Sequence, residues 1–273
     1  MTASADRVRP IGRATPVDAQ GMIVNPCHPD HIVAPWDDAL ATALALIRSS
    51  LGPALHSVYV RGSIPRGTAI ETVSDLDLVC VLDGAPRPPP RGWSPTIDAR
   101  LRQRHPFCTG ADVRGVSIER LMEPERSAAL RFLLKTQSLC IEGPDLTAAW
   151  DAVPLAHARM ALKALPASLA AIRAFMQDAS HRGPGERRPR CRWIAKKIIR
   201  AAFERVAERE RAYTRDLYPC WEAASRHDPH KAADLYQVLR LAIEPEDTPA
   251  ALEHLLQLGD WVASNPPWTN PAP

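Results

Sequence analysis

Apolar residues recur at helical spacing after Pro35, and the pattern continues to about residue 51. The apolar face consists of Leu40, Leu44, Ile47 and Leu51. Asp37 and Asp38 fall in the first turn, where carboxylates interact favourably with the helix N-terminus. Gly52 and Pro53 then end the pattern, because neither residue continues a helix well. The sequence therefore predicts a helix between Pro35 and Gly52.

Shorter apolar segments follow and predict a small sheet. We expect strands over Ser57–Val60, Asp75–Leu82 and Ala111–Ile118, a helix over Pro124–Gln137, and a last short strand and turn over Ser138–Leu146. The proline-rich segment Asp83–Pro95 predicts a turn or an exposed loop.

Helical periodicity dominates after about residue 150, and no further strand is predicted. The expected helices are Leu155–Gln177 (broken near Pro166), Arg192–Arg211, Leu217–Arg226, Pro229–Ile243 and Pro249–Ala263, with an exposed connector over His181–Arg190. We predict an α+β protein, in which a small mixed-sheet domain is followed by a C-terminal helical bundle domain. The expected parts are an irregular N-terminal arm (1–34), the sheet domain (35–150), the helical domain (151–264) and a Pro-rich tail (265–273).

Composition excludes only a few classes of function. The 273 residues carry 34 basic and 31 acidic side chains, so the net charge of +3 gives no reason to expect a long nucleic acid as partner. The six cysteines are scattered without a C-x-x-C pair, which argues against a zinc site and for reduced, mostly buried thiols. No signal peptide and no membrane-spanning apolar run is recognisable, so we expect a cytoplasmic protein.

The segment Val58–Leu82 carries the clearest chemistry. A Gly-Ser pair, Gly62-Ser63, ends one apolar segment, and Asp75 and Asp77 open the next. Alternation along a strand puts the two aspartates on one face, where their like charges repel unless a cation neutralises them. Mg²⁺ binds one or two carboxylates together with substrate phosphates. Glycine permits close backbone approach, and a neighbouring serine offers an N–H and a hydroxyl to phosphate oxygens.

This order of strand, Gly-Ser, loop, Ser-Asp-Leu-Asp and apolar strand resembles the signature of the polymerase-β-type nucleotidyltransferase superfamily. Within it, the chain is most similar to the antibiotic (aminoglycoside) nucleotidyltransferase branch, over about residues 40–243. The resemblance implies a Gly-Ser loop that holds a triphosphate, with Gly62, Ser63 and Ser74 as nucleotide-binding residues. It also implies that Asp75 and Asp77 bind Mg²⁺ and that ATP is the cosubstrate.

One further position is drawn from this resemblance, whereas the loop Ile64–Val73, which carries Arg66, departs from the family pattern. The third carboxylate, which completes the metal site or accepts a proton, is matched best by Asp112, with Glu119 at the far end of the same segment as the rival. Asp112 is preferred because strand starts in this layout lie at one edge. Arg66 in the loop is a candidate for phosphate contact, and an ordinary exposed arginine is the alternative.

A basic helix stripe is the second clue. Arg192, Lys196 and Arg200 recur at i, i+4 and i+8, with Lys197 beside them and no acidic partner before Glu204. The alternative interpretation is a solvated helix face. The resemblance implies a basic residue that faces the triphosphate from the helical domain, with Lys196 and Lys197 as equal candidates and Arg192 as a third nucleotide-binding residue. The segment Tyr213–Asp216 resembles the linker to the next helix, without an assigned role.

The leading hypothesis is thus a Mg²⁺-dependent enzyme that moves AMP from ATP to a hydroxyl of a small molecule, either an aminoglycoside-like antibiotic or a biosynthetic intermediate. A cationic acceptor would need acidic contacts, for which Glu142, Asp145, Asp216 and Glu222 are unranked candidates. The alternatives are transfer to protein or RNA, as in toxin-like members, for which the basic run Arg182–Arg192 offers a patch, and a degenerate domain that binds nucleotide without catalysis. Acceptor, nucleotide preference and oligomeric state stay open.

Overall fold

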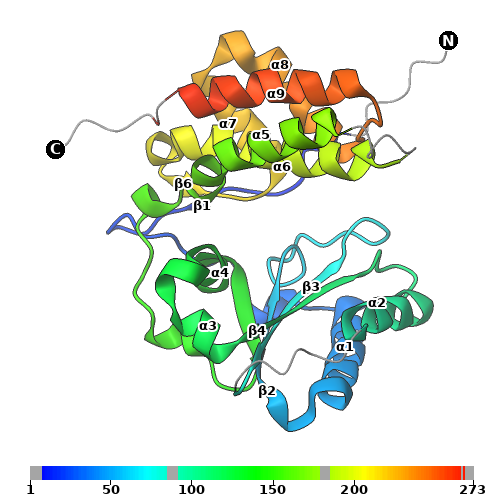
Figure 1. The fold of residues 1–273 in the computed structure, drawn as a ribbon. Helices are drawn as coiled ribbons and strands as arrows, with labels where there is room; N and C mark the ends of the chain where they lie inside the picture. Colours follow the sequence, from blue (N-terminus) through cyan, green and yellow to red (C-terminus); the bar gives the residue numbers. More distant parts are fainter. Residues whose placement is uncertain (1–7, 85–91, 179–184, 266, 268–273) are drawn as a thin grey trace. The chain divides into compact units, whose positions relative to one another are not determined.

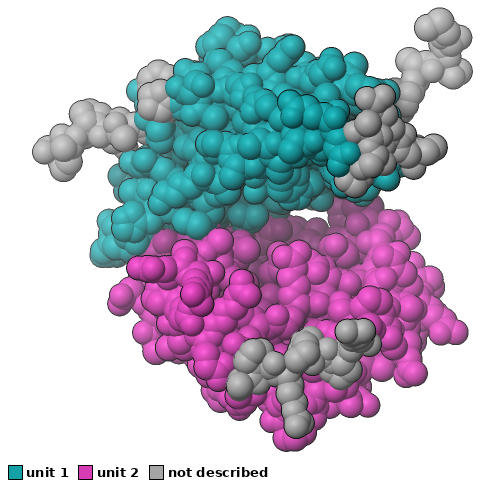
Figure 2. Space-filling model, viewed as in Figure 1, with its two compact units in different colours: residues 1–23, 154–273 teal, residues 24–153 magenta. Residues whose placement is uncertain are grey.

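Two units make up the computed structural model of the chain, which describes residues 8–84, 92–178, 185–265 and 267. One unit is Val24–Val153, and the other combines Met1–Ile23 with Pro154–Pro273. We call them the sheet unit and the helical unit (Figures 1 and 2). Residues 8–23 belong to the helical unit because Thr15–Pro16 (β1) pairs antiparallel with Ala212–Tyr213 (β6).

The sheet unit is built on a four-stranded mixed sheet. Its strands are β2 (Leu55–Arg61), β3 (Leu76–Leu82), β4 (Ala111–Ser117) and β5 (Ser138–Glu142). They lie in the order β4-β3-β2-β5; β2 is antiparallel to both β3 and β5, and β3 is parallel to β4. The C-terminal end of β2 and the N-terminal ends of β3 and β4 therefore meet at one edge.

Helices cover both faces of this sheet. They are α1 (Trp36–Leu51), α2 (Trp93–Arg104), α3 (Ile118–Met122) and α4 (Pro124–Gln137). Leu76 and Leu78 pack with α1 and α2, whereas Tyr59, Val79 and Val81 pack with α3 and α4. Figure 1 shows the two helix pairs on opposite sides of the sheet. Burial on both faces explains the nearly continuous apolar runs of β2 and β3.

The helical unit packs around one long central helix. Its helices are α5 (Met160–Gln177), α6 (Arg187–Glu210), α7 (Leu217–His227), α8 (Ala232–Ile243) and α9 (Pro249–Ser264). Helix α6 contacts the other four, and α5 packs on α9 through Gly259, where an added Cβ would lie 2.5 Å from a methyl group of Leu169. Among the described residues, no helix is long and apolar enough to cross a membrane.

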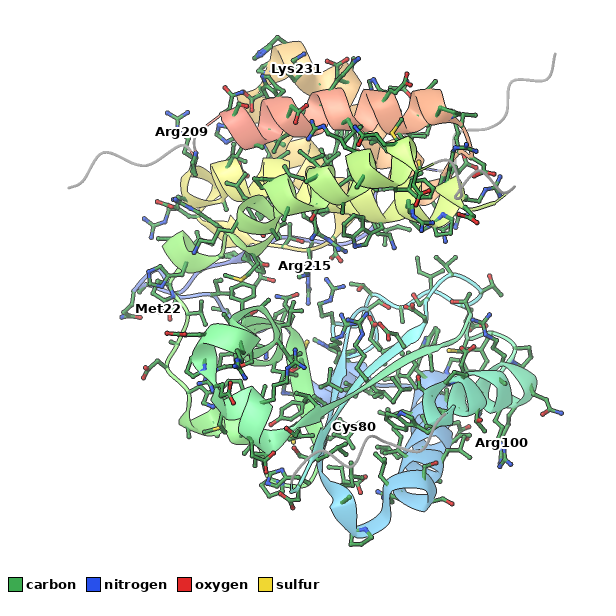
Figure 3. The ribbon with its side chains drawn as sticks, viewed as in Figure 1. Met22, Cys80, Arg100, Arg209, Arg215 and Lys231 are labelled. Atoms are coloured by element: carbon green, nitrogen blue, oxygen red, sulfur yellow. The ribbon has the colours of Figure 1, made fainter. Side chains whose placement is uncertain are left out.

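Short 3₁₀ turns connect these elements. They cover Pro29–His31 (η1), Gly52–Ala54 (η2), Leu146–Ala149 (η3), Leu155–His157 (η4) and Pro229–Lys231 (η6). All six cysteines are free thiols, and Cys80 lies inside the sheet unit (Figure 3).

The predicted α+β class, a mixed sheet followed by a helical bundle, is confirmed. The helix over Pro124–Gln137 has the predicted bounds, and the strands and the helix after Pro35 lie within one or two residues of those expected. Part of the loop predicted over Asp83–Pro95, residues 85–91, falls outside the described residues. Its end, Trp93–Pro95, is wrong as a loop because it begins α2. Sequence periodicity missed α2 because Ile97 and Leu101 are its only buried residues within the described chain.

Several predictions in the second half are corrected. The helix expected from Leu155 begins only at Met160, and the helix expected from Pro229 begins only at Ala232, because a short 3₁₀ turn precedes each. Helix α5 runs through Pro166, since the buried residues on both sides, Leu165 and Leu169 among them, hold it together despite the missing N–H. The connector predicted over His181–Arg190 is helical from Arg187, because Pro189 sits in the first turn, where no N–H is needed; residues 181–184 are not described. The strand β6 was not expected, since a two-residue pairing leaves no periodicity.

Candidate active site

Charged side chains form a row across the sheet at the edge where three strand ends meet. In the strand register, Arg61 of β2 pairs with Asp77 of β3, and Asp77 pairs with Asp112 of β4. Residues in register on adjacent strands point to the same face, here the face covered by α3 and α4. The Arg61 guanidinium donates to Asp77 Oδ1 at 2.7 Å and to Asp112 Oδ2 at 3.4 Å. The structure thus brings together two of the three predicted carboxylates, Asp77 and Asp112.

Gly62 directly follows Arg61 and touches the same aspartate. Its φ is +86°, and a Cβ added there would lie 2.6 Å from Asp77 Oδ2. Only glycine combines this backbone conformation with so close an approach. The Gly-Ser turn therefore packs against the carboxylate that opens β3.

Hydrogen bonds fold the loop after Gly62 back on itself. Arg66 Nε donates to the Gly62 carbonyl at 2.7 Å, and the Thr68 N–H donates to the Ser63 carbonyl at 3.0 Å. Ser74 holds the far end of the loop: its Oγ accepts from the Ile70 N–H at 2.9 Å. Arg66 and Ser74 thus have structural contacts, which leave a role in nucleotide binding as a prediction.

The electrostatics of the row centre on Asp77. Burial raises the pKa of Asp77 to about 6, against the lowering effect of Arg61, and the charges of Asp75 and Asp112 raise it further. Asp75 itself precedes β3 and is exposed. Arg114 also balances the row, because its guanidinium binds both carboxylate oxygens of Asp112, at 3.1 Å from Nε and 2.7 Å from Nη2. The pKa of Arg114 is raised by that hydrogen bond.

Glu119, the rival third carboxylate, lies away from this row. It is exposed on α3, seven residues after Asp112 and beyond the end of β4. At roughly 3.3 Å per strand residue, that separation exceeds the reach of a side chain. The geometry groups Asp112, and not Glu119, with Asp77.

Carboxylate oxygens are the ligands that Mg²⁺ takes, and Asp77 and Asp112 offer two adjacent ones. Across the described residues, however, no group of three or more His, Cys, Asp or Glu side chains is arranged to hold a metal ion. The donor set thus fits a cation that is completed by phosphate and water, and does not fit an all-protein metal cage.

The basic stripe predicted on α6 exists within the helical unit. Arg192 is exposed, and Lys196 is half-buried. Lys197 Nζ donates to Ser168 Oγ at 2.9 Å and lies 4.9 Å from the ring centroid of Trp193, while burial and the charge of Arg215 lower its pKa. The next stripe residue, Arg200, donates to the Arg215 carbonyl.

Glu204, the first acidic residue after the stripe, has a structural role. Its carboxylate is buried and accepts the N–H groups of Ala161 and Leu162, the first turn of α5, at 3.1 and 2.7 Å. Burial raises the pKa of Glu204 to about 7, although these hydrogen bonds and the nearby Arg215 and Arg200 lower it. Glu204 therefore caps α5 and does not act as a counter-ion at the surface.

The acidic residues considered for a cationic acceptor all have internal partners. Glu142 pairs with Arg48, Asp145 accepts from Tyr59 Oη and Thr147, Asp216 accepts from the Arg13 N–H, and Glu222 lies 3.6 Å from Arg226. These contacts give no preference for any of them as an acceptor ligand.

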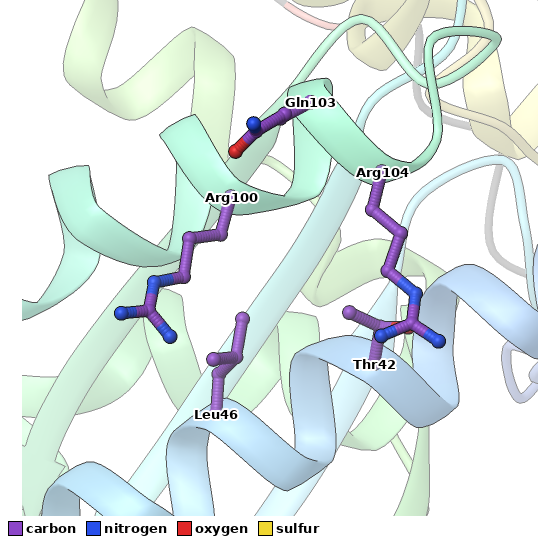
Figure 4. Close-up of a pocket in the computed structure, with 5 residues that line it drawn as sticks. All are labelled: Thr42, Leu46, Arg100, Gln103 and Arg104. Atoms are coloured by element: carbon purple, nitrogen blue, oxygen red, sulfur yellow. The ribbon is translucent and has the colours of Figure 1, made fainter.

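Sequence reasoning missed Arg61 and Arg114. Arg61 stands directly before Gly62, so its register opposite Asp77 follows once β2 and β3 are paired as a hairpin. Arg114 is two residues after Asp112 and shares its face, a spacing that alternation reveals as soon as the strand is assigned. A hollow of about 410 Å³ between α1 and α2, lined by Arg100 and Arg104 among others, lies on the opposite face and is outside this row (Figure 4).

A comparison with solved structures supports the fold. The chain is similar to spectinomycin adenyltransferase AAD(9) from Enterococcus faecialis, whose structure holds ATP and spectinomycin, with a TM-score of 0.51 and 10% identity over 83% of this chain and 98% of that one. No protein-family model and no curated protein matches the sequence. The resemblance to antibiotic nucleotidyltransferases is thus supported at the level of the fold.

Proposed function

We propose that this chain transfers a nucleoside monophosphate, AMP from ATP, to a hydroxyl group of a small molecule in a Mg²⁺-dependent reaction. The observation that carries the proposal is the row of Asp77 and Asp112 with Gly62 packed against it. The fold is similar to that of an adenyltransferase, whose structure holds ATP and a small-molecule antibiotic. That similarity supports the reaction class, and the row supplies the residues.

Mg²⁺ would be held by Asp77 and Asp112, with Asp75 at the entrance of β3, and when bound it would neutralise charge on the phosphates. The Arg61 guanidinium, which touches both carboxylates, orients them side by side. Arg61 is thus a positioning residue in this proposal.

The chain's own groups would divide the remaining tasks. Backbone and hydroxyl groups of Gly62 and Ser63, with Arg66 and Ser74 at the two ends of the loop, would bind phosphate oxygens. The acceptor oxygen forms a bond to the α-phosphorus while the bond from that phosphorus to the pyrophosphate oxygen breaks. Asp112 takes the proton from the acceptor hydroxyl. Its present partner Arg114 has an exposed side chain.

Cations on the helical unit would neutralise the departing pyrophosphate. Arg192, Lys196 and Lys197 are the candidates, because they lie together on α6. Lys197 is tied to Ser168 within the unit, whereas Arg192 is exposed and is the most accessible of the three. The role of each of these cations is part of the proposal. The domain boundaries near residues 34 and 150 are proposed as well.

The experiment is a transfer assay with ATP labelled at the α-phosphate, with and without Mg²⁺, on a panel of aminoglycosides, total RNA and cell lysate. We expect the label in a small molecule. Label in RNA or protein would instead favour the toxin-like alternative, and nucleotide binding without transfer would favour a degenerate domain. Asp112→Asn should abolish transfer, and Glu119→Gln should leave it within about threefold of wild type, since Glu119 lies outside the row.

A further inference from the structure

Trp193 is the most exposed large aromatic side chain of the described helical unit, with 44% of its surface accessible. It lines a hollow of about 390 Å³ on the N-terminal half of α6, and the hollow is also lined by Arg188, Pro189, Arg192 and Lys196. A tryptophan usually buries most of its surface, and the exposed Trp193 ring is available for contact with a ligand.

The position of the Trp193 ring is fixed from within the unit. Lys197 Nζ lies 4.9 Å from the ring centroid and is itself held by Ser168 Oγ on α5. A cation at this distance attracts the electron-rich face of an indole. The ring is therefore oriented before any ligand arrives, which lowers the entropic cost of stacking against it.

The hollow is strongly basic. Three of its five described lining residues are cations, and within the described chain no carboxylate forms an ion pair with the Arg188 or Arg192 side chain. Asp247 accepts the backbone N–H groups of Gly185, Arg187 and Arg188 at the start of α6. These hydrogen bonds lower the pKa of Asp247 and commit its charge to the helix start.

We propose that this hollow binds one nucleotide unit, with the base stacked on Trp193 and the phosphate bound by Arg188, Arg192 and Lys196. Guanidinium groups bind phosphate in a bidentate manner, and a base stacks on an indole ring whatever its identity. The inference rests on the proposed function in that it names how the helical unit contacts a nucleotide. The cations alone would bind a phosphate group. The new element of the inference is Trp193, on which the base stacks.

The same chemistry disfavours a polycationic ligand here. An aminoglycoside would bring several ammonium groups next to the cations Arg188, Arg192 and Lys196, and neighbouring like charges repel each other. The nucleotide unit has two sources, a free mononucleotide and the end of an RNA chain. Both present a base next to a phosphate, and binding measurements separate them.

The test is isothermal titration of the full chain without Mg²⁺, which excludes transfer, using AMP, ribose 5-phosphate, a single-stranded RNA tetranucleotide and spectinomycin. We expect AMP to bind at least about tenfold more tightly than ribose 5-phosphate, because one stacked base contributes on that scale. Trp193→Ala should remove this difference, and Trp193→Phe, which keeps a ring, should retain most of it. Arg192→Glu should weaken AMP and ribose 5-phosphate alike.

Arg100→Glu is the matched control for charge, because Arg100 is exposed and lines the hollow on the sheet unit instead. It should leave AMP binding within about twofold of wild type.

If the tetranucleotide binds at least tenfold more tightly than AMP, the site is assigned to an RNA end. If the two ligands bind equally, the site is assigned to a free nucleotide. AMP binding that Trp193→Ala leaves unchanged, or Trp193-dependent binding of spectinomycin, would overturn the proposal. Asp77→Asn should leave this binding intact even where it abolishes transfer, so the two proposals fail separately.

Discussion

In the sheet unit, charged side chains gather at strand ends and stay accessible, whereas in the helical unit several charges are buried among helices. Arg61, Asp77 and Asp112 keep between a fifth and two fifths of their side-chain surfaces exposed. Arg205 and Asp228, paired at 2.8 Å in the helical unit, keep only 4% and 7%. The carboxylates of the sheet unit are therefore accessible to an incoming ligand, whereas the two buried charges of the helical unit neutralise each other.

The difference teaches how to interpret a charge in each unit. A buried, fully paired charge contributes to the structure of the bundle, since removing one partner leaves the other uncompensated. A row of like-charged carboxylates held by arginines and still accessible to solvent is costly in itself and points to ligand binding. The comparison predicts that mutations in the row abolish function and spare stability, and that mutations at the buried pair do the reverse.

The largest effect is expected at Asp77. Asp77→Asn removes a carboxylate while it keeps the size of the side chain, so we expect transfer to fall by about 10³-fold or more, as for loss of a group that acts on the transition state. The melting temperature should change by no more than a few degrees. A steady-state transfer assay and thermal denaturation of the same preparation measure both, and a stable variant with normal activity would contradict the assignment.

The reverse is expected at Arg205. Arg205→Ala leaves Asp228 buried and unpaired and also removes the contact of the guanidinium with the Trp261 ring, 4.8 Å away. We expect a loss of about 3–5 kcal/mol in the free energy of unfolding, measured by urea denaturation. Arg173→Ala, which breaks the more exposed pair with Asp260, is the control and should cost less than about 1 kcal/mol. Equal losses would remove the distinction between the units.

A smaller effect is expected at Gly62. Gly62→Ala places a Cβ against Asp77 Oδ2, so the carboxylate has to shift and transfer should fall by about 10- to 100-fold. Gly84→Ala is the matched control: its φ of +83° is nearly the same, but among the described residues no atom beyond its chain neighbours lies within 4 Å of the added Cβ. That variant should show only the backbone strain, roughly 1 kcal/mol of stability, with activity retained. Similar losses of activity in both variants would argue against close packing at Asp77.

The smallest effect concerns Glu204 and pH. The folded pKa of about 7 lies above the ordinary value, so the folded state binds the proton more tightly than the unfolded state does. The contribution of Glu204 to the free energy of unfolding should therefore be largest below about pH 4.5. It should fall as the pH rises towards and through 7, by a few kcal/mol at most. Glu204→Gln should flatten this part of the urea-denaturation profile between pH 5 and 7.5. An unchanged slope would assign the pH dependence to other groups.

The strand-end motif could be predicted from sequence because alternation and glycine chemistry act locally. Asp77 and Gly62 follow from one segment, whereas Asp112 was matched through the family resemblance and preferred over Glu119 because strand starts share an edge. Arg61 could not be ranked before the β2–β3 register was known, because its partner lies 16 residues away. The role of Glu204 depends on the position of α5, which no pattern within α6 reveals. Helix α2 was not predicted because it has too few buried apolar residues to produce a helical pattern in the sequence.

The central claim is that the row at the sheet edge binds a nucleoside triphosphate with a divalent cation. Isothermal titration of a non-hydrolysable ATP analogue, with and without Mg²⁺, into wild type and a variant carrying Asp75→Asn and Asp77→Asn tests it directly. The account predicts that Mg²⁺ tightens binding to wild type by at least about tenfold and that the double variant loses this dependence. Equal, Mg²⁺-independent binding to both proteins would contradict it.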